Sequence, residues 1–350
     1  MLLSAVDDRP STTCPTGVGR YAGELAAHAG ALSGHQVLPV SALGLSITSL
    51  ADEELELPAA LERHGVDVFH SPLWALPALL PCRAVVTVHD AIPATHPALT
   101  SAAFRPVWAR AAEEVRRAAG VVCPSEHARG EVVRALGLDP ARVHVVPEAP
   151  AAVFSPRPAD VVQRAAEALG VGEPWFLAVG SLERRKNPDG VLDALAHLPA
   201  ARRPLVLFAG PAAGFDLEAE AARRGVADRV RPLGVVSDEL LAALYTGALG
   251  VVVCSRAEGF GLPVVEAWAC GAPVIASTAT ALPEVAGDAA LLVDPEDPGA
   301  LAEALARLCD EHDLRDDLRR RGRARLAARF TPDTARAALA RLYDHLEASA

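Results

Sequence analysis

The sequence predicts an α/β protein with two parallel-sheet domains, and three observations lead to this fold class. The chain has 350 residues, more than one ordinary domain needs. Short apolar runs alternate with amphipathic stretches along its whole length, as in strand–helix–strand units. A Pro-rich stretch at 147–160 interrupts this alternation near the middle of the chain. We therefore expect two domains joined by a linker.

Short apolar runs mark the expected strands, six before the Pro-rich stretch and six after it. Amphipathic segments such as 125–136 and 298–308 lie between them and are the expected helices. Strands and helices in this alternation favour a parallel sheet covered by helices on both faces. The expected strands are 2–6, 36–40, 67–70, 84–88, 121–124 and 143–146, then 175–179, 204–209, 229–233, 249–254, 273–277 and 290–293.

The expected domain boundaries follow from these elements. Residues 1–150 form the first domain and residues 151–331 the second, with the Pro-rich stretch linking them. A last helix is expected over 332–350, because Thr331 can cap its N-terminus and Pro332 suits its first position.

Composition argues against several classes of protein. Acidic residues outnumber basic ones by 44 to 33, and the formal net charge of −11 disfavours nucleic acid as the main partner. The six cysteines, from Cys14 to Cys309, are scattered without a C-x-x-C pair, so neither a disulfide framework nor a zinc site is expected. The N-terminus lacks a signal-type segment and no apolar run reaches the ~18 residues of a membrane span, which predicts a cytoplasmic protein.

Peripheral membrane contact stays open because of the segment 101–117. This segment places Phe104, Trp108 and several arginines on one expected helix. Such a helix fits either weak binding to a membrane surface or a surface helix on the acceptor side of the first domain.

The most specific motif is E-G-F-G-L-P-V-V-E, which runs from Glu258 to Glu266 after an apolar strand. Gly259 and Gly261 let backbone N–H groups approach a ligand, and Pro263 suits the first turn of a helix. The N-terminus of that helix favours an anion, whereas the two carboxylates favour hydroxyl groups. The alternative is a plain strand–turn–helix with two solvated glutamates.

A basic segment follows the first strand of the second domain. The sequence G-S-L-E-R-R-K-N at 180–187 places Arg184, Arg185 and Lys186 at the strand's carboxyl end, where ligands bind in parallel sheets. These cations would stabilise the charge that develops on a diphosphate leaving group. Lys186 is the one lysine among 33 basic residues, which indicates a preference for a compact ammonium there. The alternative is a solvated loop.

Two further motifs lie in the first domain. Gly17-Val18-Gly19 begins G-V-G-R-Y-A, which fits the dinucleotide pattern G-x-G-x-x-G/A. However, the motif lies about ten residues past its strand, and no acidic residue follows the strand at 36–40 to bind a ribose. A Gly-rich loop that closes over a ligand fits better than a nicotinamide site. His89-Asp90 follows the strand at 84–88 and points into the crevice at the carboxyl ends of the strands, where ligands bind in parallel sheets. Asp90 also suits the role of a loop cap. No D-x-D triplet occurs, which argues against a metal-held diphosphate.

These residues together resemble the retaining glycosyltransferases of family 4, which have the GT-B fold. The resemblance covers nearly the whole chain: E-G-F-G-L-P-V-V-E looks like the family's E-x7-E motif, and G-S-L-E-R-R-K-N and G-V-G-R-Y occur in the same order. It implies two Rossmann-like domains facing a central cleft, and a last helix that crosses back onto the first domain. It also implies a hexosyltransferase that moves a hexose from a nucleotide diphosphate sugar to an acceptor hydroxyl with retention. No metal or other cofactor is expected, because the chain lacks a D-x-D triplet and the cations can serve the diphosphate instead.

The resemblance implies a role for each motif residue. Glu258 would contact hydroxyls of the donor sugar, and Glu266 would bind the ribose. Lys186, with Arg184 or Arg185, would neutralise the diphosphate. The backbone of Gly259, Phe260, Gly261 and Leu262 would contact the donor sugar beside Glu258, His89 and Asp90 would sit at that sugar, and Gly17, Val18 and Gly19 would lie near the phosphates or the acceptor entrance.

The chain departs from the family pattern at two places. Many members carry Arg where this chain has Ser181 in its candidate anion site, and many carry Asn-Gly where it has Glu148-Ala149. The motifs look most like those of mannosyl- and deoxyhexosyl-transferring members, which favours a GDP-mannose-like donor, with UDP- and dTDP-sugars as alternatives. The acceptor is not identified. A GT-B-type nucleotide-sugar epimerase or hydrolase, a nicotinamide-dependent oxidoreductase and a non-catalytic sugar-nucleotide sensor remain the rival functions.

Overall fold

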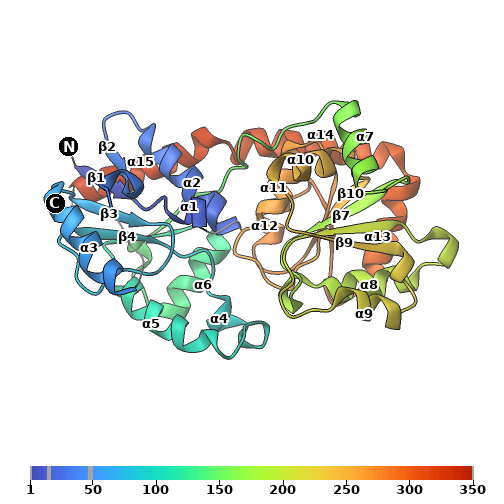
Figure 1. The fold of residues 1–350 in the computed structure, drawn as a ribbon, viewed down its shortest axis with the longest axis horizontal. Coiled ribbons are helices and arrows are strands. Elements are labelled where there is room, and N and C mark those ends of the chain that lie inside the picture. Colours follow the sequence, from blue (N-terminus) through green and yellow to red (C-terminus); the bar gives the residue numbers. More distant parts are fainter. Residues whose placement is uncertain (1, 14–16, 46–49, 349–350) are drawn as a thin grey trace. The chain divides into compact units, whose positions relative to one another are not determined.

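The computed structural model describes residues 2–13, 17–45 and 50–348 (Figure 1). Cys14, one of the six scattered cysteines, lies outside these ranges. The chain divides into two compact units. The first unit comprises Met1–Ala149 together with Thr331–Ala350, and the second comprises Pro150–Phe330.

In the described part of the first unit, six parallel strands form one sheet in the order β2-β1-β3-β4-β5-β6. The strands are β1 (Leu3–Val6), β2 (Gln36–Pro39), β3 (Val68–Ser71), β4 (Arg83–Thr87), β5 (Gly120–Cys123) and β6 (Val143–Val145). The helices are α1 (Pro10–Thr13), α2 (Gly17–Gly30), α3 (Leu50–Arg63), α4 (Ile92–Thr95), α5 (Phe104–Arg117), α6 (Glu126–Leu136) and α15 (Pro332–Ala348).

The second unit repeats this architecture with a sheet in the order β12-β11-β10-β7-β8-β9, again with parallel pairings. Its strands are β7 (Trp175–Val179), β8 (Leu205–Ala209), β9 (Val230–Gly234), β10 (Gly250–Val253), β11 (Val274–Ser277) and β12 (Leu291–Val293). Its helices are α7 (Ala159–Ala168), α8 (Pro188–His197), α9 (Leu217–Arg223), α10 (Asp238–Gly247), α11 (Leu262–Ala269), α12 (Leu282–Ala286), α13 (Pro298–Asp310) and α14 (His312–Arg329).

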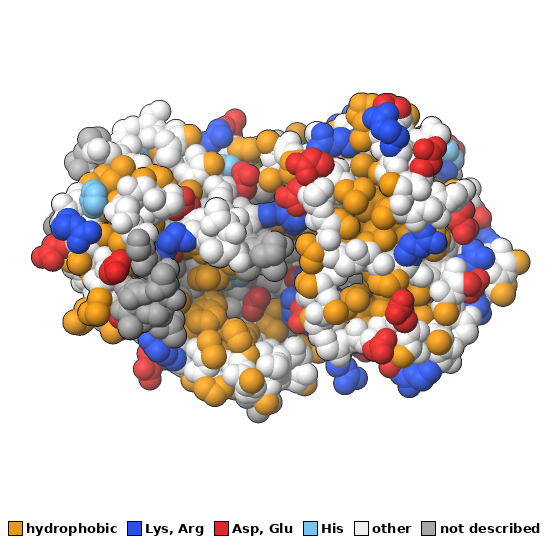
Figure 2. All heavy atoms as spheres, in the orientation of Figure 1, with side chains coloured by type: hydrophobic (Ala, Val, Ile, Leu, Met, Phe, Trp, Pro, Cys, Tyr) orange, Lys and Arg blue, Asp and Glu red, His pale blue; other side chains and the backbone are white. Residues whose placement is uncertain are grey.

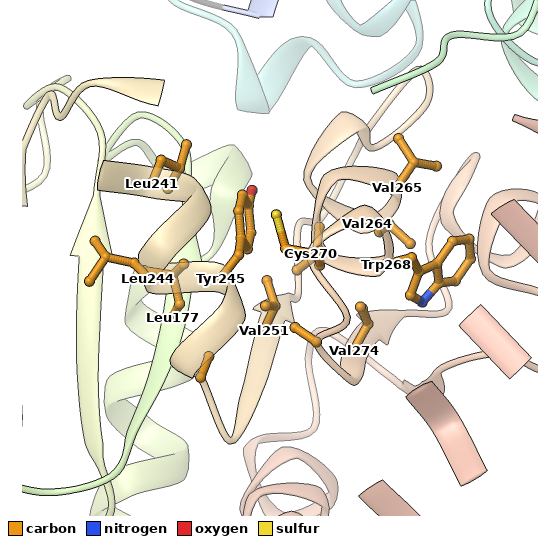
Figure 3. Close-up of a cluster of buried hydrophobic side chains, with 14 of the residues drawn as sticks. Leu177, Leu241, Leu244, Tyr245, Val251, Val264, Val265, Trp268, Cys270 and Val274 are labelled. Carbon is orange, nitrogen blue, oxygen red and sulfur yellow. The ribbon is translucent and has the colours of Figure 1, made fainter. Parts of the chain in front are cut away.

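The predicted α/β fold with two parallel sheets is confirmed. Every expected strand is present, with bounds that differ by at most one residue. Strands such as β5 and β10 are buried at every position, because helices cover both faces of the sheet. Figure 3 shows such a core in the second unit, where Leu177 of β7, Val251 of β10, Tyr245 of α10 and Trp268 of α11 gather.

One local expectation was wrong. Gly17, Val18 and Gly19 were expected in a loop, but they form the first turn of α2. The apolar face of this helix, including Tyr21 and Leu25, is buried in the first unit, and this packing outweighs the modest cost of glycine at a helix start. The boundary between the two units falls within the Pro-rich stretch at 147–160, and Phe154 of this stretch is buried in the core of the second unit.

The last helix, α15, is fixed to the first unit by apolar packing and by a buried hydrogen-bond chain. Leu339 and Leu342 are buried in a first-unit core. The Tyr343 hydroxyl lies 3.0 Å from His70 Nδ1 of β3, whose Nε2 lies 3.2 Å from Thr87 Oγ1 of β4. Thr87 Oγ1 in turn lies 3.0 Å from the hydroxyl of Tyr21 of α2. Burial lowers the pKa of His70 to about 3, so its imidazole is neutral at physiological pH.

Candidate functional site

The E-x7-E segment connects β10 to α11 through a tight turn at the carboxyl edge of the second sheet. Gly261 has φ +104° and stands at the N-terminus of α11. A Cβ atom there would lie 2.5 Å from Leu282 Cδ2, so the turn requires glycine for its backbone conformation and for the space. The Phe260 side chain is buried and packs edge-to-face on Phe330, which anchors the turn in the core.

The basic segment follows β7 at the same sheet edge. Arg184, Arg185 and Lys186 form a single 3-10 turn, and Asn187 ends it with φ +60°. The buried Asn187 side chain caps α8 by accepting a hydrogen bond from Gly190 N at 3.0 Å, and it donates to Pro295 O at 2.8 Å. Asn187 thus fixes the turn that presents the cations. The sequence signal was its position before a helix that begins with proline.

The two segments meet at the Glu258 carboxylate. Lys186 Nζ donates to Glu258 Oε1 at 2.5 Å, and Arg185 Nη1 donates to Oε2 at 3.0 Å. Ser255 Oγ donates to Oε1 at 2.7 Å, and the Glu258 backbone N–H donates to Thr280 Oγ1 at 2.8 Å. Burial alone would raise the pKa of Glu258, but Lys186, Arg185 and the Ser255 hydroxyl lower it to about 2. The carboxylate is therefore ionised and held from three directions.

This geometry differs from the expected roles of the two segments. Glu258 and Lys186 were expected to bind different parts of a ligand, whereas here they bind each other. Arg185 also pairs with Glu183 at 2.8 Å, and Ser181 Oγ donates to the same Glu183 oxygen at 2.8 Å. Two cations thus face two carboxylates. A bound anion would have to compete with these carboxylates for Lys186 and Arg185, while the exposed side chain of Arg184 extends from the same turn.

Arg256 stabilises the basic turn, a role that the sequence motifs do not indicate. Its guanidinium binds both oxygens of Asp189 at 2.9 and 3.0 Å and donates to the Arg184 carbonyl at 2.8 Å. Its backbone N–H donates to the Arg185 carbonyl at 2.8 Å. The signal was an arginine two residues before Glu258, in the short segment between β10 and the E-x7-E turn. Such paired guanidinium contacts set the geometry of the turn.

Glu266, the second carboxylate of the motif, lies in α11 with only 1% of its surface exposed. Tyr245 of α10 donates its hydroxyl proton to Glu266 Oε2 at 2.8 Å. A small hollow at the ends of β7 and β10 is lined in part by Gly180, Ser181 and Lys186. The second unit therefore gathers the candidate residues Ser181, Arg184, Arg185, Lys186, Glu258, Gly259, Phe260, Gly261, Leu262 and Glu266 on the loops after β7 and β10 and on α11.

The first unit carries its own set of polar side chains at the carboxyl ends of β4 and β6. His89 Nδ1 lies 3.2 Å from Glu148 Oε1, and His89 Nε2 lies 3.1 Å from the Pro72 carbonyl oxygen. Burial lowers the pKa of His89, but Glu148 and Asp90 more than offset this and raise it above its ordinary value. Asp90 Oδ1 accepts a hydrogen bond from Ile92 N at 3.0 Å, so its expected role as a loop cap is confirmed.

The surface features bear on the expected partners. On the face shown in Figure 2, basic and acidic side chains are intermixed, without an extended basic area. Across the described residues, no helix combines the length and apolar character needed to cross a bilayer. The membrane hypothesis relied on Phe104 and Trp108 of α5. Trp108 is buried in the first-unit core and Phe104 packs against that core, so these aromatic side chains do not form an exposed apolar face.

The fold and these loops together define the class of protein. Two parallel-sheet units, with an E-x7-E turn and a basic turn at the same sheet edge of the second, are the GT-B architecture. The model of the family described as "Glycosyl transferases group 1" matches residues 162–325, and that of "Glycosyltransferase Family 4" matches residues 47–149. The chain belongs to glycosyltransferase family 4.

Named relatives agree with this assignment. The chain is 33% identical to O-antigen chain mannosyltransferase B of Escherichia coli over 274 residues, which are 76% of this chain and 71% of that protein. It is 39% identical to D-inositol 3-phosphate glycosyltransferase of Xylanimonas cellulosilytica over 250 residues, 66% of this chain but only 58% of that protein. Among solved structures, HepE of Anabaena in complex with UDP has a TM-score of 0.74 at 18% identity, covering 99% of this chain and all of that one. This last likeness concerns the fold.

Proposed function

We propose that the chain transfers a hexose from a nucleotide diphosphate sugar to an acceptor hydroxyl, with retention of configuration and without a metal ion. The observation that carries the proposal is the binding of the buried Glu258 carboxylate by Lys186 and Arg185 at the carboxyl edge of the second sheet. Family 4 membership supports the transfer reaction, and the UDP bound to the structurally similar HepE supports a nucleotide-sugar donor.

In this proposal the ion pairs rearrange when the donor binds. The diphosphate binds Lys186 and Arg185 in place of Glu258. The Glu258 oxygens then become available to the sugar hydroxyls. As the sugar–phosphate bond breaks, the leaving diphosphate gains negative charge and the two cations stabilise it. Family 4 membership supports attack by the acceptor on the face that the diphosphate leaves, without a covalent enzyme intermediate.

Independence from metal is a separate part of the proposal. It is supported by the absence of a D-x-D triplet from the sequence and by the cations of the basic turn. We expect unchanged turnover after treatment with EDTA. Loss of activity that Mg²⁺ or Mn²⁺ restores would overturn this part and leave the transfer reaction standing.

The donor is proposed to be GDP-mannose-like, with UDP- and dTDP-sugars as alternatives. The mannosyltransferase of E. coli supports the first and the UDP complex of HepE supports the second. A thermal-shift panel of GDP, UDP, dTDP, ADP and NAD separates them, because a ligand at 100 times its Kd adds about 2.7 kcal/mol of stability. Stabilisation by NAD alone would favour an oxidoreductase and contradict the proposal.

The reaction type is tested by turnover with and without an acceptor. We expect release of the nucleoside diphosphate to depend on an added sugar or lipid-linked acceptor, and the product to keep the anomeric configuration of the donor. Equal release into water would indicate a hydrolase, and sugar isomerisation without transfer would indicate an epimerase. The predicted cytoplasmic location is tested independently by cell fractionation.

A further inference from the structure

The His89–Glu148 pair in the first unit joins two strand ends that are 59 residues apart in sequence. The His89 side chain is 20% exposed and the Glu148 side chain 9% exposed, so the contact is largely removed from water. Both ring nitrogens of His89 face an oxygen that can only accept, a carboxylate at Nδ1 and the Pro72 carbonyl at Nε2. A neutral imidazole has a single N–H group and can satisfy only one of them. The geometry therefore calls for an imidazolium.

The surroundings of the ring hold it in place. Tyr21 of α2 packs edge-to-face on His89 with ring centroids 4.6 Å apart, and its hydroxyl is engaged with Thr87. The titratable groups that face the ring are therefore Glu148 after β6, Asp90 after β4 and Tyr21 on α2. Of these, Glu148 is in direct hydrogen-bond contact with the ring.

We propose that Glu148 is a positioning residue that fixes His89 as a doubly protonated ring at the carboxyl edge of the first sheet, in the form the transfer reaction uses. This inference rests on the function proposed above. With both N–H groups engaged, His89 supplies a fixed positive charge and does not act as a general base. The proton of the acceptor hydroxyl must then go to another group or to the departing diphosphate.

The chain's departure at Glu148 fits this role. An uncharged amide at this position would accept a hydrogen bond from His89 but would not stabilise its charge. Glutamate adds that charge, and a largely buried charge pair is sensitive to the loss of either partner.

The test compares Glu148→Gln with a matched control, Glu131→Gln. Glu131 lies on α6, its side chain is also 9% exposed, and it faces a histidine, His127, at 3.5 Å. The first readout is the titration of the His89 ring by NMR, assigned with a His89→Gln variant. The second is the pH profile of donor turnover, with kcat and KM determined separately.

We expect Glu148→Gln to move the His89 titration at least one pH unit lower, and to lower kcat at pH 8 by on the order of tenfold with little change in donor KM. Glu131→Gln should match the wild type in both readouts. Glu148→Asn supplies a second variant if glutamine disturbs the fold, which far-UV circular dichroism checks.

Two results would overturn the inference. One is a His89 titration in Glu148→Gln that coincides with the wild type, and the other is a pH profile that coincides with Glu131→Gln. If the wild type transfers sugar normally and Glu148→Gln behaves like it, only the inference about the His89–Glu148 pair fails. A wild type without turnover on any nucleotide sugar removes the proposed function as well, so the wild-type assay distinguishes the two failures.

Discussion

At the scale of single residues, the lone lysine occupies a closely packed position between Gly180 and Glu258. The Lys186 stem lies over Gly180, close enough that a Cβ on that glycine would be 3.2 Å from Lys186 Cε. Its ammonium lies 2.5 Å from Glu258. A compact point charge on a straight stem fits this space, whereas a planar guanidinium needs more width. The survival of lysine in a chain that otherwise uses arginine thus has a structural reason.

We predict that Lys186→Arg lowers kcat by on the order of tenfold or more while nucleotide binding remains measurable. Arginine keeps the charge but displaces it from the leaving group. Steady-state kinetics and nucleotide titration measure the two effects, and Arg307→Lys, at an exposed ion pair on α13, is the control. Wild-type kcat and KM in Lys186→Arg would show that the position tolerates any cation.

At the scale of elements, the end of β7 determines where the basic turn lies. Gly180 has φ +140°, and a Cβ on Gly210 at the end of β8 would come within 2.1 Å of the Gly180 carbonyl oxygen. The two strand ends therefore approach each other closely through their backbones, which requires glycine at 210, while the positive φ of Gly180 favours glycine at that position. The strand geometry is part of the site.

Gly180→Ala is predicted to lower donor turnover strongly while it lowers the free energy of unfolding only modestly. The new methyl group would push the Lys186 stem and strain the backbone, with a stability cost of about 1 kcal/mol. Gly172→Ala is the matched control, because a Cβ there meets nothing within 4 Å and its φ is not positive. Urea unfolding and donor turnover are compared for both variants; equal turnover in the two would contradict the prediction.

The buried chain from Tyr21 to Tyr343 ties α2, β3, β4 and α15 together, and it makes stability depend on pH. Burial lowers the pKa of His70 to about 3, whereas an unfolded histidine titrates near 6.5. Between these values the unfolded chain binds a proton that the folded chain does not. The stability is therefore complete above pH 6.5 and is lost progressively as the pH falls.

We predict that the His70 contribution removes about 2 kcal/mol of stability between pH 7 and pH 5. The difference in unfolding free energy between these two pH values, from urea melts, should be smaller by that amount in His70→Gln. His312→Gln is the control, since the His312 side chain is 69% exposed. The same pH dependence in wild type and His70→Gln would mean that His70 is accessible to protons in the folded state.

At the scale of the whole molecule, the first unit is discontinuous in sequence, because the last segment of the chain completes it. Leu339, Leu342 and Tyr343 of α15 are at most 2% exposed. Each buried leucine contributes about 2 kcal/mol of transfer free energy, which is a large part of the roughly 5–15 kcal/mol of stability of a typical domain.

Deletion of residues 331–350 is therefore predicted to unfold the first unit and leave the second folded. Limited proteolysis with mass spectrometry should show cleavage throughout residues 1–149 and protection of residues 150–330. Nucleotide binding, which we assign to the second unit, should persist. Equal protection of the two units after the deletion would show that α15 is dispensable for the first.

The sequence by itself determined the strands and the family. Buried parallel strands are short, apolar and rich in valine. Runs such as AVVTV at 84–88 and LGVVVC at 249–254 could therefore be identified as strands without knowledge of their neighbours in the sheet. The E-x7-E and basic motifs are local, because the turns that they form need particular residues at fixed spacing. The predicted identity of the site residues rests on this local chemistry.

The tertiary structure decided which of these residues meet. Lys186 and Glu258 are 72 residues apart, and their contact depends on β7 lying beside β10 in the sheet. The pairing of His89 with Glu148, the role of Arg256 and the burial of Trp108 likewise depend on the order of elements in space. Gly17 to Gly19 are helical because the apolar face of α2 packs against α15 and the sheet of the first unit. Strand order and packing arise from long-range contacts, and local patterns carry little information about these.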